Sequence, residues 1–286
     1  MKELCKHIYF ISVEILQSVI SILSILLFSS FKSARRMSLL AKENHGCDCV
    51  ILGNGPSLKE VLDKDLDKLK KNKMVAVNMF CSSNEFRLLK PEYYVIADPL
   101  YFNNEENERI VMQRKSLVEN LNKIDWNMTL FLPSINRKSN TIQKISNKNI
   151  NIVFYNLTPL SGFDKIQYWL FTNNLGMPAA KNVLCASIFI MANLNFKNIY
   201  LLGADHSWIN GVKVNDKNEL VRIDEHFYDT SEYVFPYSIY VFMKGFTECM
   251  QTHERLAKYT KHLDVNVWNA TKGSYIDAYP RKYDVF

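Results

Sequence analysis

From Cys47 onward, short runs of β-branched and aromatic residues alternate with longer stretches in which apolar residues recur every three or four positions. The short runs have the length and composition of buried strands, and the longer stretches have the periodicity of amphipathic helices. Strands separated by helices predict a mostly parallel sheet with right-handed crossovers. The expected strands are 49–52, 74–78, 93–97, 129–132, 151–155, 198–202 and 265–268.

Three stretches between these runs have a helical pattern. Apolar residues recur at helical spacing over 58–69, a second apolar helix is expected over 183–194, and a long one runs from about 242 to 262. No internal repeat, low-complexity tract or Gly/Ser-rich linker divides this part of the chain. We therefore expect one α/β domain over residues 38–286.

Residues 8–31 form an apolar stretch whose only ionisable side chains are Tyr9 and Glu14. A helix needs about 20 apolar residues to cross a bilayer core, so this length suffices. No small-residue cleavage site follows, which argues against a removed signal peptide. We therefore interpret residues 1–37 as a membrane anchor and its basic flank. The basic residues Lys32, Arg35 and Arg36 of this flank predict that the following domain is cytoplasmic, at a bacterial inner membrane.

The same stretch carries polar residues along one helical face, and this leaves its placement open. Three arrangements are compatible with the pattern: a spanning helix that hides this face in a homo-oligomer, a helix that lies in the membrane interface, and a soluble packing helix. The polar residues are Glu14, Gln17, Ser18, Ser21 and Ser24.

The charge balance is mildly basic, with 35 Lys and Arg against 29 Asp and Glu and a formal net charge of +6. The excess is scattered, so a nucleic-acid partner is not expected, whereas an anionic membrane or a phosphorylated substrate suits it. Six cysteines lack the spacing of a disulfide framework, which indicates a reducing compartment. Cys47 and Cys49 follow His45, and we favour thiols at the start of a buried strand over a metal site there.

The strongest local motif is Gly53-Asn54-Gly55-Pro56-Ser57, which joins the first expected strand to the first expected helix. Proline is tolerated in a first helical turn, and the free N–H groups at a helix N-terminus attract anions. Glycines let a backbone pass close to a ligand. The motif matches neither the three-glycine dinucleotide pattern nor a P-loop. It predicts nucleotide or phosphate binding, with a merely tight strand–helix turn as the alternative.

Polar residues follow other expected strands, and in a parallel sheet they share one edge. Asn78 and Asp98 follow the second and third strands and are candidates to contact a base or ribose, or to cap a turn. Asp205 follows the sixth strand in Gly203-Ala204-Asp205. A polar loop with His226 comes next, and a histidine and carboxylates there predict a general base, an acid or metal ligands.

The segment after the last strand contains Thr271 and Ser274 around a glycine. Its hydroxyls and backbone amides are candidates to close the nucleotide pocket, and an ordinary glycine turn is the alternative.

The run 51–60 resembles the opening motif of bacterial lipooligosaccharide sialyltransferases. The resemblance implies one Rossmann-like domain of a modified GT-A type, a CMP-sialic acid donor and no metal requirement. Asn78 matches a nucleotide-binding asparagine of that family, and Asn182 to Asp205 resembles its later helix–strand segment with a Gly-x-Asp at the end. Asp98 replaces an asparagine of the family, and the tyrosines expected after Asp205 are absent. His226 is the nearest candidate for the family's catalytic histidine.

The chain also resembles a broader family that includes motility accessory factors and archaeal hydroxymethyldihydropterin diphosphokinases. The residues that carry this resemblance are Gly-x-Gly-Pro-Ser-Leu at 53–58, the strand-end Asp98, Gly203-Ala204-Asp205 and the closing run 269–281. In the kinase branch Asp98 and Asp205 would be Mg²⁺ ligands. The membrane segment favours the glycan branch, because a lipid-linked acceptor explains an anchor and a soluble pterin does not.

Together these features predict a membrane-bound glycosyltransferase that uses a nucleotide-sugar donor and a glycan or glycolipid acceptor. A Mg²⁺-dependent diphosphokinase and a non-catalytic membrane-tethered scaffold are the alternatives. His226 and Asp205 are the expected catalytic residues. No cofactor is required if the enzyme is sialyltransferase-like, Mg²⁺ is possible, and Asp98 and Asp205 are the candidate metal ligands. The expected nucleotide-binding residues are Gly53, Asn54, Gly55, Pro56, Ser57, Asn78, Asp98, Asn182, Gly203, Thr271 and Ser274.

Overall fold

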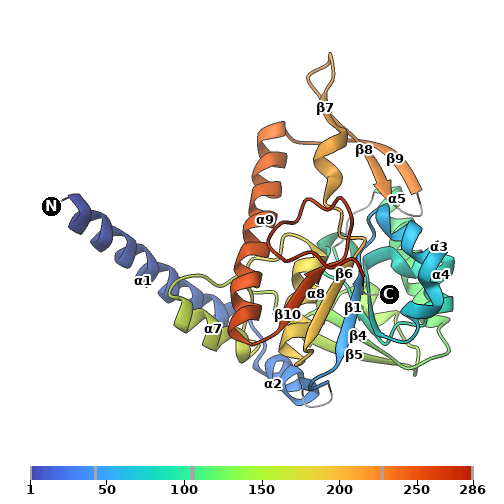
Figure 1. Ribbon diagram of the computed structural model, residues 1–286, viewed down its shortest axis with the longest axis horizontal. Coiled ribbons are helices and arrows are strands. Elements are labelled where there is room, and N and C mark those ends of the chain that lie inside the picture. Colours follow the sequence, from blue (N-terminus) through green and yellow to red (C-terminus); the bar gives the residue numbers. More distant parts are fainter. Residues whose placement is uncertain (1, 42–43, 104–106, 227–228, 285–286) are drawn as a thin grey trace.

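A computed structural model describes residues 2–41, 44–103, 107–226 and 229–284, and in it seven parallel strands form one central sheet (Figure 1). The strand order is β10-β6-β1-β2-β3-β4-β5. All seven expected strands are confirmed, with small shifts at their ends. Their bounds are β1 Asp48–Leu52, β2 Lys73–Val77, β3 Tyr93–Val95, β4 Met128–Pro133, β5 Ile150–Tyr155, β6 Asn198–Leu202 and β10 Asn266–Asn269.

Helices cover both faces of this sheet because successive strand residues point to opposite sides. In β1, Cys49 and Ile51 join one apolar core and Val50 and Leu52 join the other. The first core includes α8 (Val183–Asn193) and α9 (Ile239–His262), and the second includes α3 (Ser57–Leu69), α4 (Asn84–Leu89) and α5 (Glu108–Asn122). The three helices expected from the sequence correspond to α3, α8 and α9. The shorter helices α6 (Asn140–Gln143) and α7 (Asp164–Thr172) follow β4 and β5.

The direction in which successive strands are added to the sheet reverses beside β1, and this creates a crevice. From β1 the strands proceed outward through β2, β3 and β4 to β5, after which the chain returns to place β6 on the other side of β1. In open parallel sheets ligands bind at such a switch point, outside the carboxyl ends of the strands. The loops that follow β1 and β6 both lie at this point.

A second, antiparallel sheet of three strands stands at the end of the molecule where the loop after β6 emerges (Figure 1). It consists of β7 (Val212–Val214), β8 (Leu220–His226) and β9 (Asp229–Val234). The pattern of the sequence predicted a long polar loop here, and that prediction was wrong. The alternation of Leu220, Arg222 and Asp224 with Val221 and Ile223 has the two-residue period of a strand.

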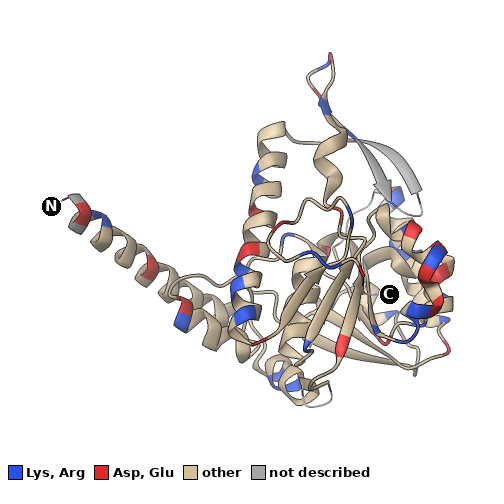
Figure 2. Ribbon diagram, in the orientation of Figure 1, with Lys and Arg blue, Asp and Glu red and all other residues tan. Residues whose placement is uncertain are grey.

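The N-terminal apolar stretch forms α1 (Lys2–Phe28), whose residues 5–28 are long and apolar enough to cross a membrane. Figure 2 colours most of α1 as uncharged. Its polar face packs on its own domain: the Ser21 hydroxyl donates to the Ser161 carbonyl (2.8 Å), and the Phe163 N–H donates to Ser18 Oγ (3.1 Å). A Cβ at Gly162 would lie 2.1 Å from Ser18 Oγ, so a glycine is required at this contact. This docking gives Ser18 and Ser21 hydrogen-bond partners within the same chain.

The following helix α2 (Phe31–Leu40) belongs to the α/β body and not to a separate anchor. Ser33, Ala34 and Met37 are buried, and α2 packs on β5. The Ser30 N–H donates to Asn156 Oδ1 (2.8 Å), and Asn156 Nδ2 donates back to the Ser30 carbonyl (3.1 Å). Residues 31–37, which were expected to belong to the anchor and its basic flank, therefore pack on the α/β body.

Candidate functional site

Two glycine-containing loops touch backbone to backbone at the switch point. The Gly53 N–H donates to the Leu202 carbonyl (2.7 Å), and the Gly55 N–H donates to the Gly203 carbonyl (2.9 Å). A Cβ at Gly53 would lie 2.4 Å from the Gly203 oxygen, and Gly203 has a φ of +63°. These glycines therefore allow the loop after β1 to lie directly against the loop after β6. The motif had predicted that these glycines approach a ligand, whereas here they approach another loop of the chain.

Asp205 occupies the N-terminus of α3, where the sequence analysis expected an anionic ligand. Its carboxylate accepts a hydrogen bond from the Ser57 N–H (3.2 Å) and another from the Ser57 hydroxyl (2.8 Å). Burial raises the pKa of Asp205 above its ordinary value, and the hydrogen bonds from Ser57 oppose that rise. The favourable electrostatic position at the helix N-terminus is thus filled by a protein carboxylate. Nucleotide binding by the glycine loop stays a prediction.

A cleft opens beside these two loops, between the ends of β1, β2 and β6 and the start of α8. Three asparagines converge on it from different elements: Asn54 from the glycine loop, Asn78 from the end of β2, and Asn182 from the start of α8. Asn54 Nδ2 donates to the Val77 carbonyl (3.2 Å), and Asn182 Oδ1 accepts from the Leu184 N–H (2.7 Å) and so caps α8. The remaining lining residues are Gly55, Pro56, Val77, Val183, Leu184, Gly203, Asp205, His206, Ser207 and Trp208.

Asn78 has a buried acceptor that faces no donor within the described part of the chain. Its backbone is left-handed (φ 47°), and its carbonyl accepts a hydrogen bond from the Tyr94 hydroxyl, which holds the residue in place. The side-chain Oδ1 is buried and has no hydrogen-bond partner among the described residues. A buried acceptor without a donor costs about 1–3 kcal/mol. A ligand with an N–H or O–H group would remove that cost.

Thr271 and Ser274 hold the loop after β6. Thr271 Oγ1 accepts from the Ala204 N–H (3.0 Å) and donates to the Leu201 carbonyl (3.0 Å), while the Ser274 hydroxyl donates to the Ala204 carbonyl (2.6 Å). Thr271 also lines a second hollow with Ser57 and Gly203, on the side of the loops away from the asparagines. The two hydroxyls thus fix the position of Asp205, and a nucleotide contact from them stays a prediction.

Asp98 does not join this cleft. Its carboxylate accepts from the Leu100 N–H (3.0 Å) and caps the short 3₁₀ turn Pro99–Tyr101, and burial raises its pKa. β1 and β2 lie between the strands that precede Asp98 and Asp205, which corresponds to roughly 14 Å at the usual strand spacing. Two ligands of one Mg²⁺ lie within about 4 Å of each other. The described fold therefore does not bring these two carboxylates together as a Mg²⁺ site.

His226 is the last residue of β8, at the edge of the described residues. Its side chain lies outside the described part of the structure, so its catalytic role stays a prediction.

His206 and Trp208 line the cleft, and neither was among the site residues predicted from the sequence. The two rings stack with centroids 4.7 Å apart, and His206 has a left-handed backbone (φ 52°). The signal available in the sequence was the position of His206 directly after Asp205. Neighbouring residues in a turn point in different directions. Asp205 therefore contacts α3, whereas His206 turns toward His253 on α9.

The fold and the cleft thus define an α/β protein with a polar, asparagine-lined crevice at its switch point. No family model matches the sequence, and a search of curated proteins finds no match. Among solved structures the chain is similar to "MAf glycosyltransferase from Magnetospirillum magneticum AMB-1", with a TM-score of 0.47 and 14% sequence identity. The match covers 84% of this chain and 34% of that protein, so the chain spans about a third of its length.

Proposed function

We propose that this protein is a glycosyltransferase that binds a nucleotide-sugar donor in the asparagine-lined cleft. The observation that carries this proposal is the buried Oδ1 of Asn78, which has no partner among the described residues and lies at the switch point. An amino group of a base or a hydroxyl of a ribose supplies the missing donor. Asn54 and Asn182 line the same cleft and offer further amide groups for polar recognition of a nucleotide.

The charges around the cleft favour a donor with a single phosphate. Among the described residues that line it, Asp205 and His206 are ionisable and none is a lysine or arginine. A diphosphate carries more negative charge and is normally matched by Mg²⁺ or basic side chains. A CMP-linked sugar, such as a sialic or other nonulosonic acid, presents one phosphate and suits this lining better.

The proposed reaction is a displacement at the anomeric carbon. An acceptor hydroxyl forms the new C–O bond, the bond from the anomeric carbon to the phosphate oxygen breaks, and CMP departs with the electron pair. A base takes the acceptor proton, and His226 is the proposed base. Asp205 lines the cleft, and its hydrogen bonds to Ser57 fix the glycine loop. Attack opposite the leaving group inverts the anomeric configuration.

The acceptor is proposed to be a glycan or glycolipid at a membrane surface. The outer face of α1 is apolar and exposed: Leu26 is 66% and Leu27 75% exposed. Trp169 on α7 is 62% exposed, and Figure 1 shows α7 beside α1. Tryptophan is favoured where a protein meets a membrane interface. We therefore place the domain on the cytoplasmic face of a bacterial inner membrane, within reach of lipid-linked acceptors.

Calorimetric titration of the full chain in detergent tests the donor site, with CMP, UDP, GDP and ATP, each with and without Mg²⁺. We expect binding of CMP without metal and at least a tenfold loss of affinity in Asn78→Ala. Asn195→Ala is a matched control, because Asn195 is also left-handed (φ 64°) but is exposed and bonds the Ala41 carbonyl. Binding of ATP only with Mg²⁺ would favour the diphosphokinase, and binding of no nucleotide would favour the scaffold.

A further inference from the structure

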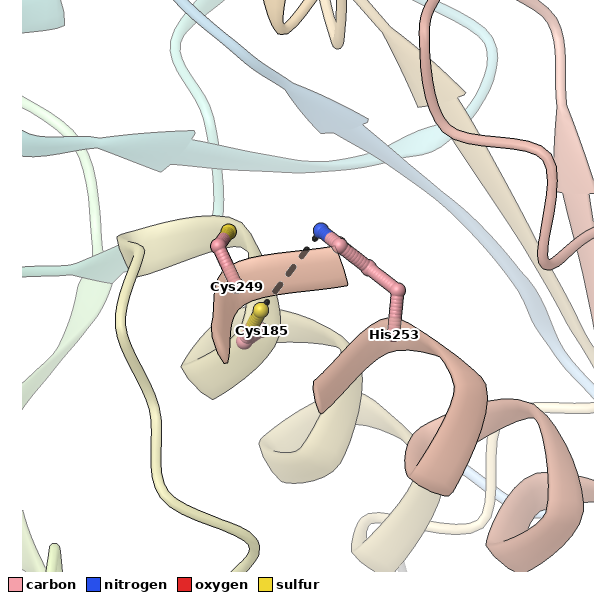
Figure 3. Close-up of side chains that lie close together, drawn as sticks. All are labelled: Cys185, Cys249 and His253. Carbon is pink, nitrogen blue, oxygen red and sulfur yellow. Dashed lines mark hydrogen bonds between the residues drawn. The ribbon is translucent and has the colours of Figure 1, made fainter. Parts of the chain in front are cut away.

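Four potential metal ligands converge in the core behind the cleft, on the side of the sheet that α8 and α9 cover. Cys185 lies in the first turn of α8, and Cys249 and His253 lie four residues apart on α9, so both face the same side of that helix. Figure 3 shows these three side chains pointing toward one another. Their ligand atoms lie within 4.8 Å of one another, and His253 Nε2 is 3.5 Å from Cys185 Sγ.

His206 completes the group from the loop after β6. Its Nε2 is 3.1 Å from His253 Nε2 and 3.6 Å from Cys249 Sγ. All four residues are buried, with exposed fractions of 3% or less. His206 Nε2 therefore lies beside two of the three ligand atoms of the group, Cys249 Sγ and His253 Nε2.

Three of the six distances between these four atoms match the edges of a tetrahedron around zinc. With Zn–S bonds of about 2.3 Å and Zn–N bonds of about 2.0 Å, tetrahedral geometry places two nitrogens about 3.3 Å apart and a nitrogen and a sulfur about 3.5 Å apart. The observed nitrogen–nitrogen distance is 3.1 Å, and the nitrogen–sulfur distances are 3.5 and 3.6 Å. We propose that Cys185, Cys249, His206 and His253 bind one structural Zn²⁺ ion.

The surroundings of the two histidines also fit this role. His253 Nδ1 is 3.1 Å from the Tyr279 hydroxyl, and a hydrogen bond on this nitrogen leaves Nε2 for the metal. The stacked Trp208 ring holds the His206 imidazole. Two thiolates and two neutral imidazoles around Zn²⁺ make a complex with no net charge, which lowers the cost of burial. The two thiols release their protons to solvent when the ion binds.

The ion would join three parts of the chain that meet behind the cleft. It links α8 and α9 to the loop that carries Asp205, which in turn bonds Ser57 in the glycine loop. All four coordination positions come from the protein, as in structural zinc sites, so no position is open for catalysis. The site stands independently of the proposed transferase activity.

Metal analysis of the full chain, purified in detergent without a histidine tag, tests the site first. We expect about one zinc per chain by mass spectrometry. X-ray absorption at the zinc edge should show two sulfur and two nitrogen neighbours at about 2.3 and 2.0 Å. These measurements use the unaltered protein, so they do not depend on whether a variant folds. A zinc content below one tenth of an ion per chain, after growth with zinc and anaerobic reconstitution of the purified protein with zinc, would overturn the proposal. A shell of oxygen ligands around the ion would also overturn it.

Substitutions then assign the ligands. Cys249→Ser, His253→Gln and His206→Gln should each lower the zinc content at least tenfold. The matched controls Cys47→Ser and His262→Gln should keep one zinc per chain, since Cys47 lies before β1 and the His262 ring packs on Tyr168 at the far end of α9. If the three ligand variants retain zinc like the controls, the ion is bound elsewhere and the assignment is wrong.

Discussion

The Asp205 carboxylate accepts hydrogen bonds from both the N–H and the hydroxyl of Ser57. The loop after β6 therefore packs against the N-terminus of α3. This contact joins the two loops that form one side of the cleft. The N–H and hydroxyl of Ser57 are therefore engaged by a carboxylate of the protein itself.

Replacing Asp205 with alanine should destabilise the protein by about 2 kcal/mol, because both donors of Ser57 lose a buried acceptor. Asp205→Asn should retain most of the stability, since the amide oxygen still accepts one of these hydrogen bonds. Urea unfolding followed by circular dichroism measures both effects. Equal loss in the two variants would show that charge, and not the acceptor, stabilises the contact.

The raised pKa of Asp205 predicts how the stability of the protein depends on pH. Because burial raises the pKa of the Asp205 carboxyl, the folded protein binds a proton there more readily than the unfolded chain does. The wild type should therefore gain stability relative to Asp205→Asn as the pH falls from neutral toward about 4, the ordinary pKa of an aspartate. This additional stability is lost as the pH rises through the pKa of Asp205 in the folded protein. Denaturation of both proteins across this range measures the difference, and an opposite slope would contradict the assignment.

Gly55→Ala should destabilise the protein by about 3 kcal/mol through overpacking. A Cβ there would lie 1.9 Å from Asp205 Oδ2 and 2.6 Å from the Gly203 oxygen. Gly245→Ala is the control: it lies in α9 with no atom within 4 Å of an added Cβ, so helix propensity should make it stabilising by about 0.5–1 kcal/mol. Thermal and urea unfolding distinguish the two, and a neutral Gly55→Ala would show that the loops can separate.

Removal of residues 1–28 should cost the contacts of Ser18, Ser21 and Ile25, and removal of 1–37 should cost at least about 3 kcal/mol more. The larger deletion takes away Met37, which is 1% exposed, and burying a methionine side chain is worth about 2–5 kcal/mol relative to alanine. It also removes the paired hydrogen bonds between Ser30 and Asn156. Melting temperatures of the two truncated proteins test the boundary, and equal values would place it at residue 38.

His226→Ala should lower kcat by about 10²–10⁴, the usual contribution of a general base, while the affinity for CMP stays unchanged. His45→Ala is a control on an exposed histidine at the opposite edge of the sheet, ahead of β1. Steady-state kinetics with a CMP-sugar donor, together with calorimetry, separates the two quantities. Loss of CMP affinity with unchanged kcat would assign His226 to donor binding instead.

The sequence by itself determined the elements of the central sheet. All seven strands and the helices α3, α8 and α9 follow from local periodicity, because burial of one face or of both faces imposes a repeat of apolar residues along the chain. The glycine loop and Asn78 were likewise identifiable, since each lies at the end of a strand with a strong pattern. The short β7–β9 hairpins were missed because polar and charged residues dominate them.

Only the tertiary structure decided how the strand ends are grouped. The order of strands places β6 beside β1, and so brings Asp205 to Ser57 and leaves Asp98 several strands away. The Cys-x₃-His spacing of Cys249 and His253 was visible in the sequence, yet their partners at 185 and 206 come from other elements. Such contacts depend on chain topology, which a local pattern of residues does not encode.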